Sequence, residues 1–216
     1  SALTSRLKVQ PIQSEAVILL AEIKLKLGLT DEATALLEKH KQLDPCSIWL
    51  REYYIGERRN AEAARVIQSL PKTGSLGDLI NQAIMYQLAG DVRSASDLCK
   101  KVLIQQPSNA IAMNHLGRAL FNTGAIDQAL AVFRKAVETA PDYFQAWHNL
   151  GHVLRALNDV PAAAEAYAKA ISLAPYYQSA LLNLAILQMN QADNLAAANN
   201  LRSLLHFNPR HAEALL

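Results

Sequence analysis

The chain of 216 residues is 51% hydrophobic and carries a formal net charge of +2 at pH 7. No apolar run is long enough to cross a bilayer, so we expect no membrane-spanning segment. Lys and Arg are spread along the chain without forming a basic stripe, which argues against a nucleic-acid partner. Two cysteines, Cys46 and Cys99, are predicted to be separate structural thiols.

Proline residues recur with a fixed period. Six prolines stand at Pro11, Pro45, Pro107, Pro141, Pro175 and Pro209. Four of the five intervals between them are 34 residues long. A period of this length is typical of stacked helix–turn–helix repeats. One helix pair is too thin to bury its own apolar face, so neighbouring pairs must stack.

In chain order, the period predicts six helix pairs over about 14–47, 48–75, 76–109, 110–143, 144–177 and 178–211. Gly28, Gly90 and Gly124 stand where a first helix should end, because Gly readily adopts the left-handed cap conformation. A proline then ends each second helix, since it cannot donate the next backbone hydrogen bond.

The pair at 48–75 is short and departs from the period. We predict its helices at 46–56 and 60–70, joined around Glu57, Arg58 and Arg59. The following segment, 71–77, is the richest in turn-forming residues. We expect either a kink there or a division between two sub-arrays.

Both ends of the sequence are in phase with flanking repeats. Pro11 is expected to end an upstream second helix at 1–10, so residues 1–13 and 212–216 are predicted to be fragments of further units. The array would then be truncated at both ends and belong to a longer polypeptide.

The residues inside the pairs form a recognisable motif. Residues 144–177 hold Trp147, Leu150, Gly151, Leu154, Ala163, Tyr167, Ala170 and Pro175, and the preceding unit holds Met113, Leu116, Gly117, Leu120, Ala129, Phe133, Ala136 and Pro141. This pattern resembles the tetratricopeptide repeat family over nearly the whole chain. The resemblance implies an all-α, right-handed superhelical solenoid of antiparallel helix pairs with a concave and a convex surface.

In that family the first helices line the concave groove. The resemblance therefore assigns eleven candidate groove residues: Asn81, Asn114, His115, Arg118, Asn122, His148, Asn149, His152, Arg155, Asn183 and Asn190. The position before the Leu-Gly pair recurs every 34 residues, and its polar row is similar to the asparagine ladder in the repeat arm of O-linked N-acetylglucosamine transferase. An Asn amide both donates and accepts hydrogen bonds, so it suits an extended peptide backbone. The alternative is that these amides bond a neighbouring helix.

Charge indicates what partner would suit this row. Residues 110–123 and 144–157 contain no Asp or Glu but include Arg118, Arg155 and three histidines. This favours a protein or peptide segment that is acidic or ends in a carboxylate. The family's two-carboxylate clamp for chaperone tails is not carried over, because Asn114, Asn149, Ser179 and Asn183 stand near the clamp positions.

No catalytic constellation is present, since the chain lacks a Gly-rich phosphate loop and an HExxH motif. His148, His152 and His115 would be spaced to share a zinc ion, but no carboxylate or thiol accompanies them. We therefore predict ordinary polar groove residues, with no metal, no cofactor and no enzymatic activity in this chain.

Two functions follow from the fold. The first is a protein-interaction scaffold that holds an extended peptide or partner segment in the groove. The alternative is the substrate-recognition arm of a larger glycosyltransferase or sulfotransferase whose catalytic domain lies outside these residues. Self-association through uncapped ends is a third possibility. We expect a cytoplasmic location.

Overall fold

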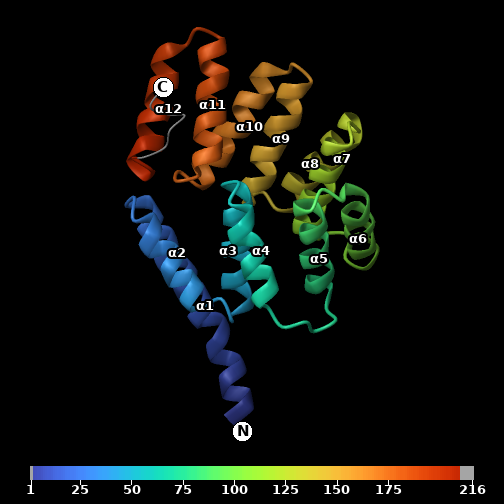
Figure 1. Cartoon of the computed structure of the whole chain (residues 1–216). Helices are drawn as coiled ribbons and strands as arrows, with labels where there is room; N and C mark the ends of the chain where they lie inside the picture. The colour runs from blue at the N-terminus through green and yellow to red at the C-terminus, as the bar shows by residue number, and fades with distance from the viewer. Residues whose placement is uncertain (1, 210–216) are drawn as a thin grey trace. The chain divides into compact units, whose positions relative to one another are not determined.

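The computed structural model describes the backbone of residues 2–209 and the side chains of residues 14–209 except that of Asp44. Every regular element in this range is an α-helix (Figure 1). The helices are α1 (Ala2–Lys26), α2 (Thr30–Lys39), α3 (Asp44–Gly56), α4 (Asn60–Ser69), α5 (Leu76–Leu88), α6 (Val92–Gln105), α7 (Ala110–Asn122), α8 (Ile126–Thr139), α9 (Phe144–Ala156), α10 (Val160–Leu173), α11 (Gln178–Asn190) and α12 (Asn194–Phe207). The predicted all-α fold is confirmed.

Residue contacts divide the chain into two compact units, which we describe separately. One contains residues 71–200, and the other contains residues up to Leu70 together with those from Leu201 on. One boundary falls at the start of the turn-rich segment 71–77, where the sequence predicted a kink or a division, and the other falls within α12. The side chain of Ser75 caps α5 by accepting the backbone N–H of Asp78, and Asp78 Oδ2 accepts the N–H groups of Thr73 and Gly74 at 2.6 Å.

Residues 71–200 form a regular helical repeat. The first helices begin at Leu76, Ala110, Phe144 and Gln178, which are the predicted starts of four units. Each of α5, α7 and α9 packs on the following helix of its own pair, and each second helix α6, α8 and α10 packs on the next first helix. This is the stacking expected of a helical-repeat superhelix.

In the other unit, α1 packs on α2 and α3, and α3 packs on α4. The helices predicted at 46–56 and 60–70 are observed as α3 and α4. The predicted helix break at Pro11 is wrong, because α1 continues through this residue. A proline removes one backbone donor, but the remaining hydrogen bonds of a long helix can carry it past that point. Pro45 lies in the first turn of α3, where a missing N–H costs no helical hydrogen bond.

The turn inside each helix pair has the same backbone conformation. Gly28, Gly90 and Gly124 have positive φ angles of 76°, 84° and 79°, as the sequence predicted. Arg58, Asn158 and Ala192 occupy the same position with φ near 60°. In each turn the N–H three residues after the last helical residue donates back to a carbonyl of the last helical turn, for example Asp193 N to Gln188 O at 2.9 Å. This is the Schellman arrangement, which residues other than Gly adopt at a cost.

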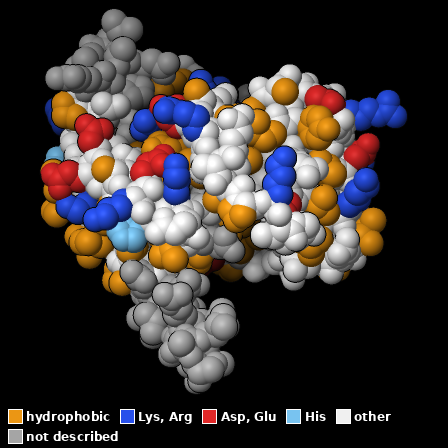
Figure 2. Space-filling view, turned by 60° about the horizontal axis from the view of Figure 1, so that its bottom comes forward, with side chains coloured by type: hydrophobic (Ala, Val, Ile, Leu, Met, Phe, Trp, Pro, Cys, Tyr) orange, Lys and Arg blue, Asp and Glu red, His pale blue; other side chains and the backbone are white. Residues whose placement is uncertain are grey.

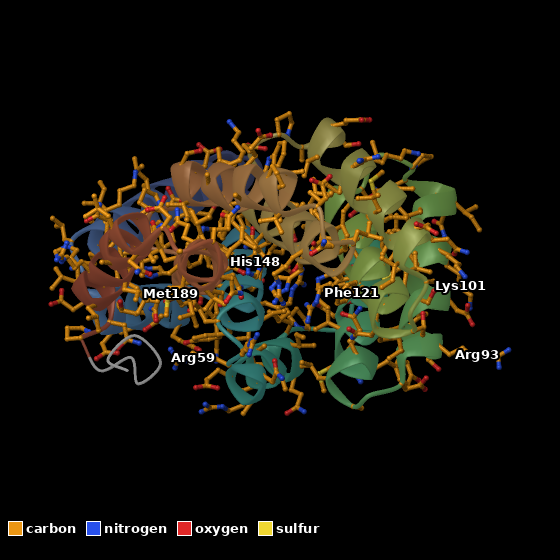
Figure 3. The ribbon with its side chains drawn as sticks, turned by 90° about the horizontal axis from the view of Figure 1, so that it is seen from above. Arg59, Arg93, Lys101, Phe121, His148 and Met189 are labelled. Atoms are coloured by element: carbon orange, nitrogen blue, oxygen red, sulfur yellow. The ribbon has the colours of Figure 1, made fainter. Side chains whose placement is uncertain are left out.

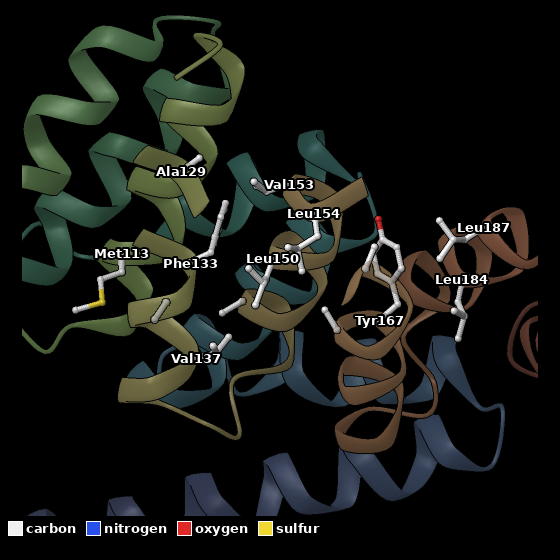
Figure 4. Close-up of a cluster of buried hydrophobic side chains, with 14 residues drawn as sticks. Met113, Ala129, Phe133, Val137, Leu150, Val153, Leu154, Tyr167, Leu184 and Leu187 are labelled. Carbon is white, nitrogen blue, oxygen red and sulfur yellow. The ribbon is translucent and has the colours of Figure 1, made fainter. Parts of the chain in front are cut away.

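Within two of the helix pairs, a glycine of the first helix contacts an aromatic side chain of the second helix. A Cβ atom on Gly151 would lie 2.7 Å from the Tyr167 ring, and one on Gly117 would lie 2.7 Å from the Phe133 ring. Both rings are at most 1% exposed. Figure 4 shows Leu150 and Leu154 of α9 in the cluster that contains Phe133 and Tyr167. The absence of a side chain at the two glycines therefore sets the close approach of the helices.

The two thiols are buried, free and in different units. Cys99 packs with Ala83 and Leu116, and burial raises its pKa to about 12. Burial also raises the pKa of Cys46. Both residues therefore fill space as structural thiols, in agreement with the sequence prediction.

Replacing Ala192 by Gly should stabilise the chain by roughly 0.5–1 kcal/mol, because Gly adopts positive φ without the steric cost of a Cβ atom. Urea unfolding monitored by circular dichroism measures this. The matched control is Ala131→Gly on the exposed side of α8, which should destabilise by about 1 kcal/mol. If both variants destabilise equally, the left-handed turn carries no strain.

Gly151→Ala should lower the free energy of unfolding by about 1–3 kcal/mol through overpacking against Tyr167. In the double variant with Tyr167→Leu, the smaller side chain should leave room for the new methyl group. A double-mutant cycle should then give a favourable coupling of at least about 0.5 kcal/mol. Strictly additive effects would mean that the two residues do not constrain each other.

Candidate functional site

All eleven predicted groove residues lie on first helices of the 71–200 unit. Asn81 is on α5, four residues from Asn114 to Asn122 are on α7, four from His148 to Arg155 are on α9, and Asn183 and Asn190 are on α11. In Figure 3, His148 and Phe121 lie on the inner side of the arc formed by these repeats, whereas Arg93 and Lys101 of α6 lie on its outer side.

Side chains of this set connect α7 to α9. Asn149 Nδ2 donates to Asn114 Oδ1 at 2.8 Å, and Asn114 Nδ2 donates to the Tyr143 hydroxyl at 3.2 Å. Asn114 is 2% exposed, so its amide oxygen depends on this protein partner.

A second group connects α9 to α11. Asn183 Nδ2 lies 3.0 Å from His148 Nε2 and 3.2 Å from His152 Nε2, and it donates to the carbonyl of Ser179 at 2.7 Å. A ring nitrogen that faces an amide NH₂ group must accept, so His148 Nε2 carries no proton when this contact forms. The other nitrogen, Nδ1, then donates to the Tyr177 hydroxyl at 3.3 Å.

A third contact connects α5 to α7. Gln87 Oε1 lies 3.0 Å from His115 Nδ1, and Gln87 Nε2 donates to the His115 carbonyl at 2.6 Å. His115 is fully buried.

We call the residues of these three contacts the inter-repeat network: Gln87, Asn114, His115, Tyr143, His148, Asn149, His152, Tyr177, Ser179 and Asn183. The network uses the histidines as hydrogen-bonding groups, and no cluster of three metal-ligating side chains occurs among the described residues.

Solvent exposure separates the predicted residues into three sets. Asn114, His115 and His148 are buried. Asn122, Arg155 and Asn190 are exposed and lie at the C-terminal ends of α7, α9 and α11. Half-buried positions lie between these extremes: Asn81, Arg118, Asn149, His152 and Asn183. A partner would therefore meet the exposed helix ends most directly.

Gln87 and Gln145 are among the residues that sequence reasoning missed. Gln87 bonds to His115, and Gln145 lies one helical turn before Asn149 on α9. Gln145 is 7% exposed, and its Oε1 atom has no hydrogen-bond partner. The only sequence signal for Gln145 is its place on the first helix, three residues before His148.

The surface has mixed charge. On the face drawn in Figure 2, outside the grey atoms, basic and acidic side chains lie next to one another. Across the described residues, no helix combines the length and hydropathy required of a membrane span.

Comparison with known proteins identifies the repeat. Two family models described as tetratricopeptide repeat match residues 86–151 and 126–178. Among curated proteins, none has a significantly matching sequence.

Solved structures share the fold. MamA from Desulfovibrio magneticus RS-1 is 20% identical with a TM-score of 0.55, and the match covers 77% of this chain and 95% of that one. The O-GlcNAc transferase of Thermobaculum terrenum is 27% identical with a TM-score of 0.57, covering 60% of this chain but 25% of the transferase chain. The APC/C hetero-tetramer Cut9–Hcn1 gives a TM-score of 0.62 at 17% identity, covering 94% of this chain and 41% of that chain.

Replacing Asn149 by Ala should destabilise the chain by about 1 kcal/mol, because it removes a bond between repeats and leaves the buried Asn114 oxygen unpaired. Ala is the better helix former by roughly half a kcal/mol, so a net loss of stability isolates the hydrogen bond. Thermal and urea unfolding measure the change. Asn122→Ala on the exposed end of α7 is the control and should stay within about 0.5 kcal/mol of the parent; an equal loss in both variants would contradict the prediction.

Proposed function

We infer that this chain, a member of the tetratricopeptide repeat family, is a protein-interaction scaffold whose first helices bind an extended segment of a partner protein. The Cut9–Hcn1 assembly shows that a protein of this fold forms complexes with other proteins. The 71–200 unit would provide the binding surface, because it presents four consecutive first helices in one register.

The observation that carries the proposal is the charge of α7 and α9. These two helices contain no Asp or Glu, and each contributes one guanidinium group, Arg118 on α7 and Arg155 on α9. Arg155 is exposed and Arg118 is half-buried. A guanidinium donates several hydrogen bonds in one plane and binds carboxylates in a bidentate manner. The preferred partner segment would therefore be acidic or end in a carboxylate.

Neighbouring amides would add to this recognition. Asn122 and Asn190 are exposed at the ends of α7 and α11. Amides of this kind bind peptide backbone without selecting its side chains. Arginines would supply the charge preference, and the amides would hold the extended backbone.

The role of the inter-repeat network in this proposal is to fix the first helices relative to one another. Asn149 donates to the Asn114 side chain, and Asn183 Nδ2 lies 3.0 Å from His148 Nε2. We therefore assign their main effect on binding to the spacing of the helices, while the exposed residues contact the partner.

The test uses two short fluorescent Gly/Ser peptides, one with several Glu residues and one with Gln in their place. The acidic peptide should bind more tightly, and Arg118→Gln with Arg155→Gln should weaken it by at least about tenfold without changing thermal stability. The control is Arg93→Gln with Arg134→Gln, two exposed arginines of second helices. Equal binding of both peptides, or equal effects of both variant pairs, would refute the acidic preference.

The match to O-GlcNAc transferase favours the second candidate function, a substrate-recognition arm. The two sequences are 27% identical, but the match covers only a quarter of the transferase chain. The comparison therefore does not extend the catalytic activity of that protein to this chain. The groove chemistry would be the same in both cases. The intact mass of the polypeptide in its source cells separates them, because an arm requires a catalytic domain in the same polypeptide.

A further inference from the structure

Helix α11 carries apolar side chains on more than one side. Ile186 and Met189 are 39% and 54% exposed. The helix contains no Asp, Glu, Lys or Arg residue. A helix that is apolar on several sides is typical of one that packs on a neighbour at each of them. The side that packs inside the repeat consists of the buried Leu181, Leu184, Ala185 and Leu187.

Ile186 occupies a position that is polar on the two preceding first helices. Because α7, α9 and α11 begin 34 residues apart, Ile186 is equivalent to Arg118 and His152. Both equivalents are candidate groove residues, and both are half-buried. A further helix pair follows α7 and α9 in the chain and leaves this position accessible on each of them. The exposure of Ile186 is therefore a property of its position within the repeat.

Met189 occupies the position of the exposed Arg155 on α9 and of the half-buried Phe121 on α7. Figure 3 shows Phe121 on the inner side of the arc. Ile186 lies three residues before Met189, and the half-buried Leu182 lies one helical turn before Ile186, so the three side chains adjoin on the helix surface. We call Leu182, Ile186 and Met189 the apolar patch.

The candidate groove therefore changes its chemistry between α9 and α11. A partner carboxylate has a guanidinium group to bind at Arg155, but α11 offers it no cation. A carboxylate placed on the apolar patch would lose hydration without gaining a partner. A large aliphatic side chain placed there would instead remove apolar surface from water on both molecules.

Helix packing sets the spacing between the two kinds of contact. Asn183 Nδ2 of α11 lies 3.0 Å from His148 Nε2 of α9, so the two helices are neighbours. The axes of neighbouring helices usually lie roughly 8–10 Å apart. An extended chain advances about 3.4 Å per residue. About three residues of an extended segment therefore separate a side chain over α9 from one over α11.

We propose that the apolar patch is a specificity site for one large aliphatic side chain of the partner segment, about three residues from a carboxylate that binds Arg155. The proposal rests on the proposed function, because it assigns both contacts to the same extended acidic segment. Acidic residues of the segment lie over α7 and α9, and its aliphatic residue lies over α11.

The test extends the acidic Gly/Ser peptide with a single Leu, placed three residues after the last Glu in one peptide and three residues before the first Glu in another. Two matched peptides carry Ser in place of Leu. At least one Leu peptide should bind the whole chain about fivefold more tightly than its Ser counterpart, measured by fluorescence anisotropy. The two placements cover both directions of the segment along the groove.

Ile186→Gln with Met189→Gln should remove the gain from Leu and leave the affinity for the Ser peptide unchanged. Unchanged binding of the Ser peptide also shows that the variant is folded. The single variant Met189→Gln, at the more exposed position, keeps the test valid if the double variant unfolds, and it should reduce the gain at least about twofold. Its matched control is Ile104→Gln on α6, where the side chain is 80% exposed, and this control should keep the full gain.

Three results would overturn the proposal. If Leu adds no affinity in either placement, or if Met189→Gln and Ile104→Gln reduce the gain equally, the patch does not select the segment, and the preference for Glu over Gln at Arg118 and Arg155 stands unaffected. Loss of that preference would refute the proposed function and this proposal with it. A dimer in sedimentation velocity that Ile186→Gln with Met189→Gln abolishes would assign the patch to a second copy of this chain.

Discussion

The close contact between Gly151 and the Tyr167 ring, repeated between Gly117 and Phe133, sets the geometry on which the 71–200 unit depends. Because no Cβ atom separates them, the first and second helices approach closely, and each aromatic ring is enclosed in the core. Neighbouring first helices are then near enough for Asn149 to reach Asn114 and for Asn183 to reach His148. The polar contacts between repeats are therefore a consequence of apolar packing within them.

The fold was predictable because its signals are local and periodic. Proline spacing located the four first helices that begin at Leu76, Ala110, Phe144 and Gln178, and Gly28, Gly90 and Gly124 marked three turns. The turns at Arg58, Asn158 and Ala192 gave no such signal, because tertiary packing holds a non-glycine residue in the left-handed region. At Pro11 the sequence predicted a helix end that the structure does not have. The position of Pro11 fits the 34-residue period, but the period does not show whether a long helix tolerates the loss of one backbone N–H donor.

The helices that carry the candidate residues were predictable, but the hydrogen bonds of these residues were not. Sequence spacing placed Asn81, His115, Asn149 and Asn183 on equivalent sides of successive helices. It could not show that His115 is fully buried against Gln87, since a hydrogen bond between repeats depends on the offset of two helices in space. Gln145 was missed for a related reason, because its unpaired oxygen becomes notable only once burial removes water from it.

The placement of the two cysteines has a practical consequence. Each compact unit contains one thiol, Cys46 in the first and Cys99 in the second, and both are shielded from solvent. A thiolate is the form that reacts with alkylating reagents, and burial suppresses it at both sites. Reaction at either sulfur therefore requires local opening of the unit that contains it. The rate at which an alkylating reagent modifies Cys46 or Cys99 would therefore measure how often each unit opens.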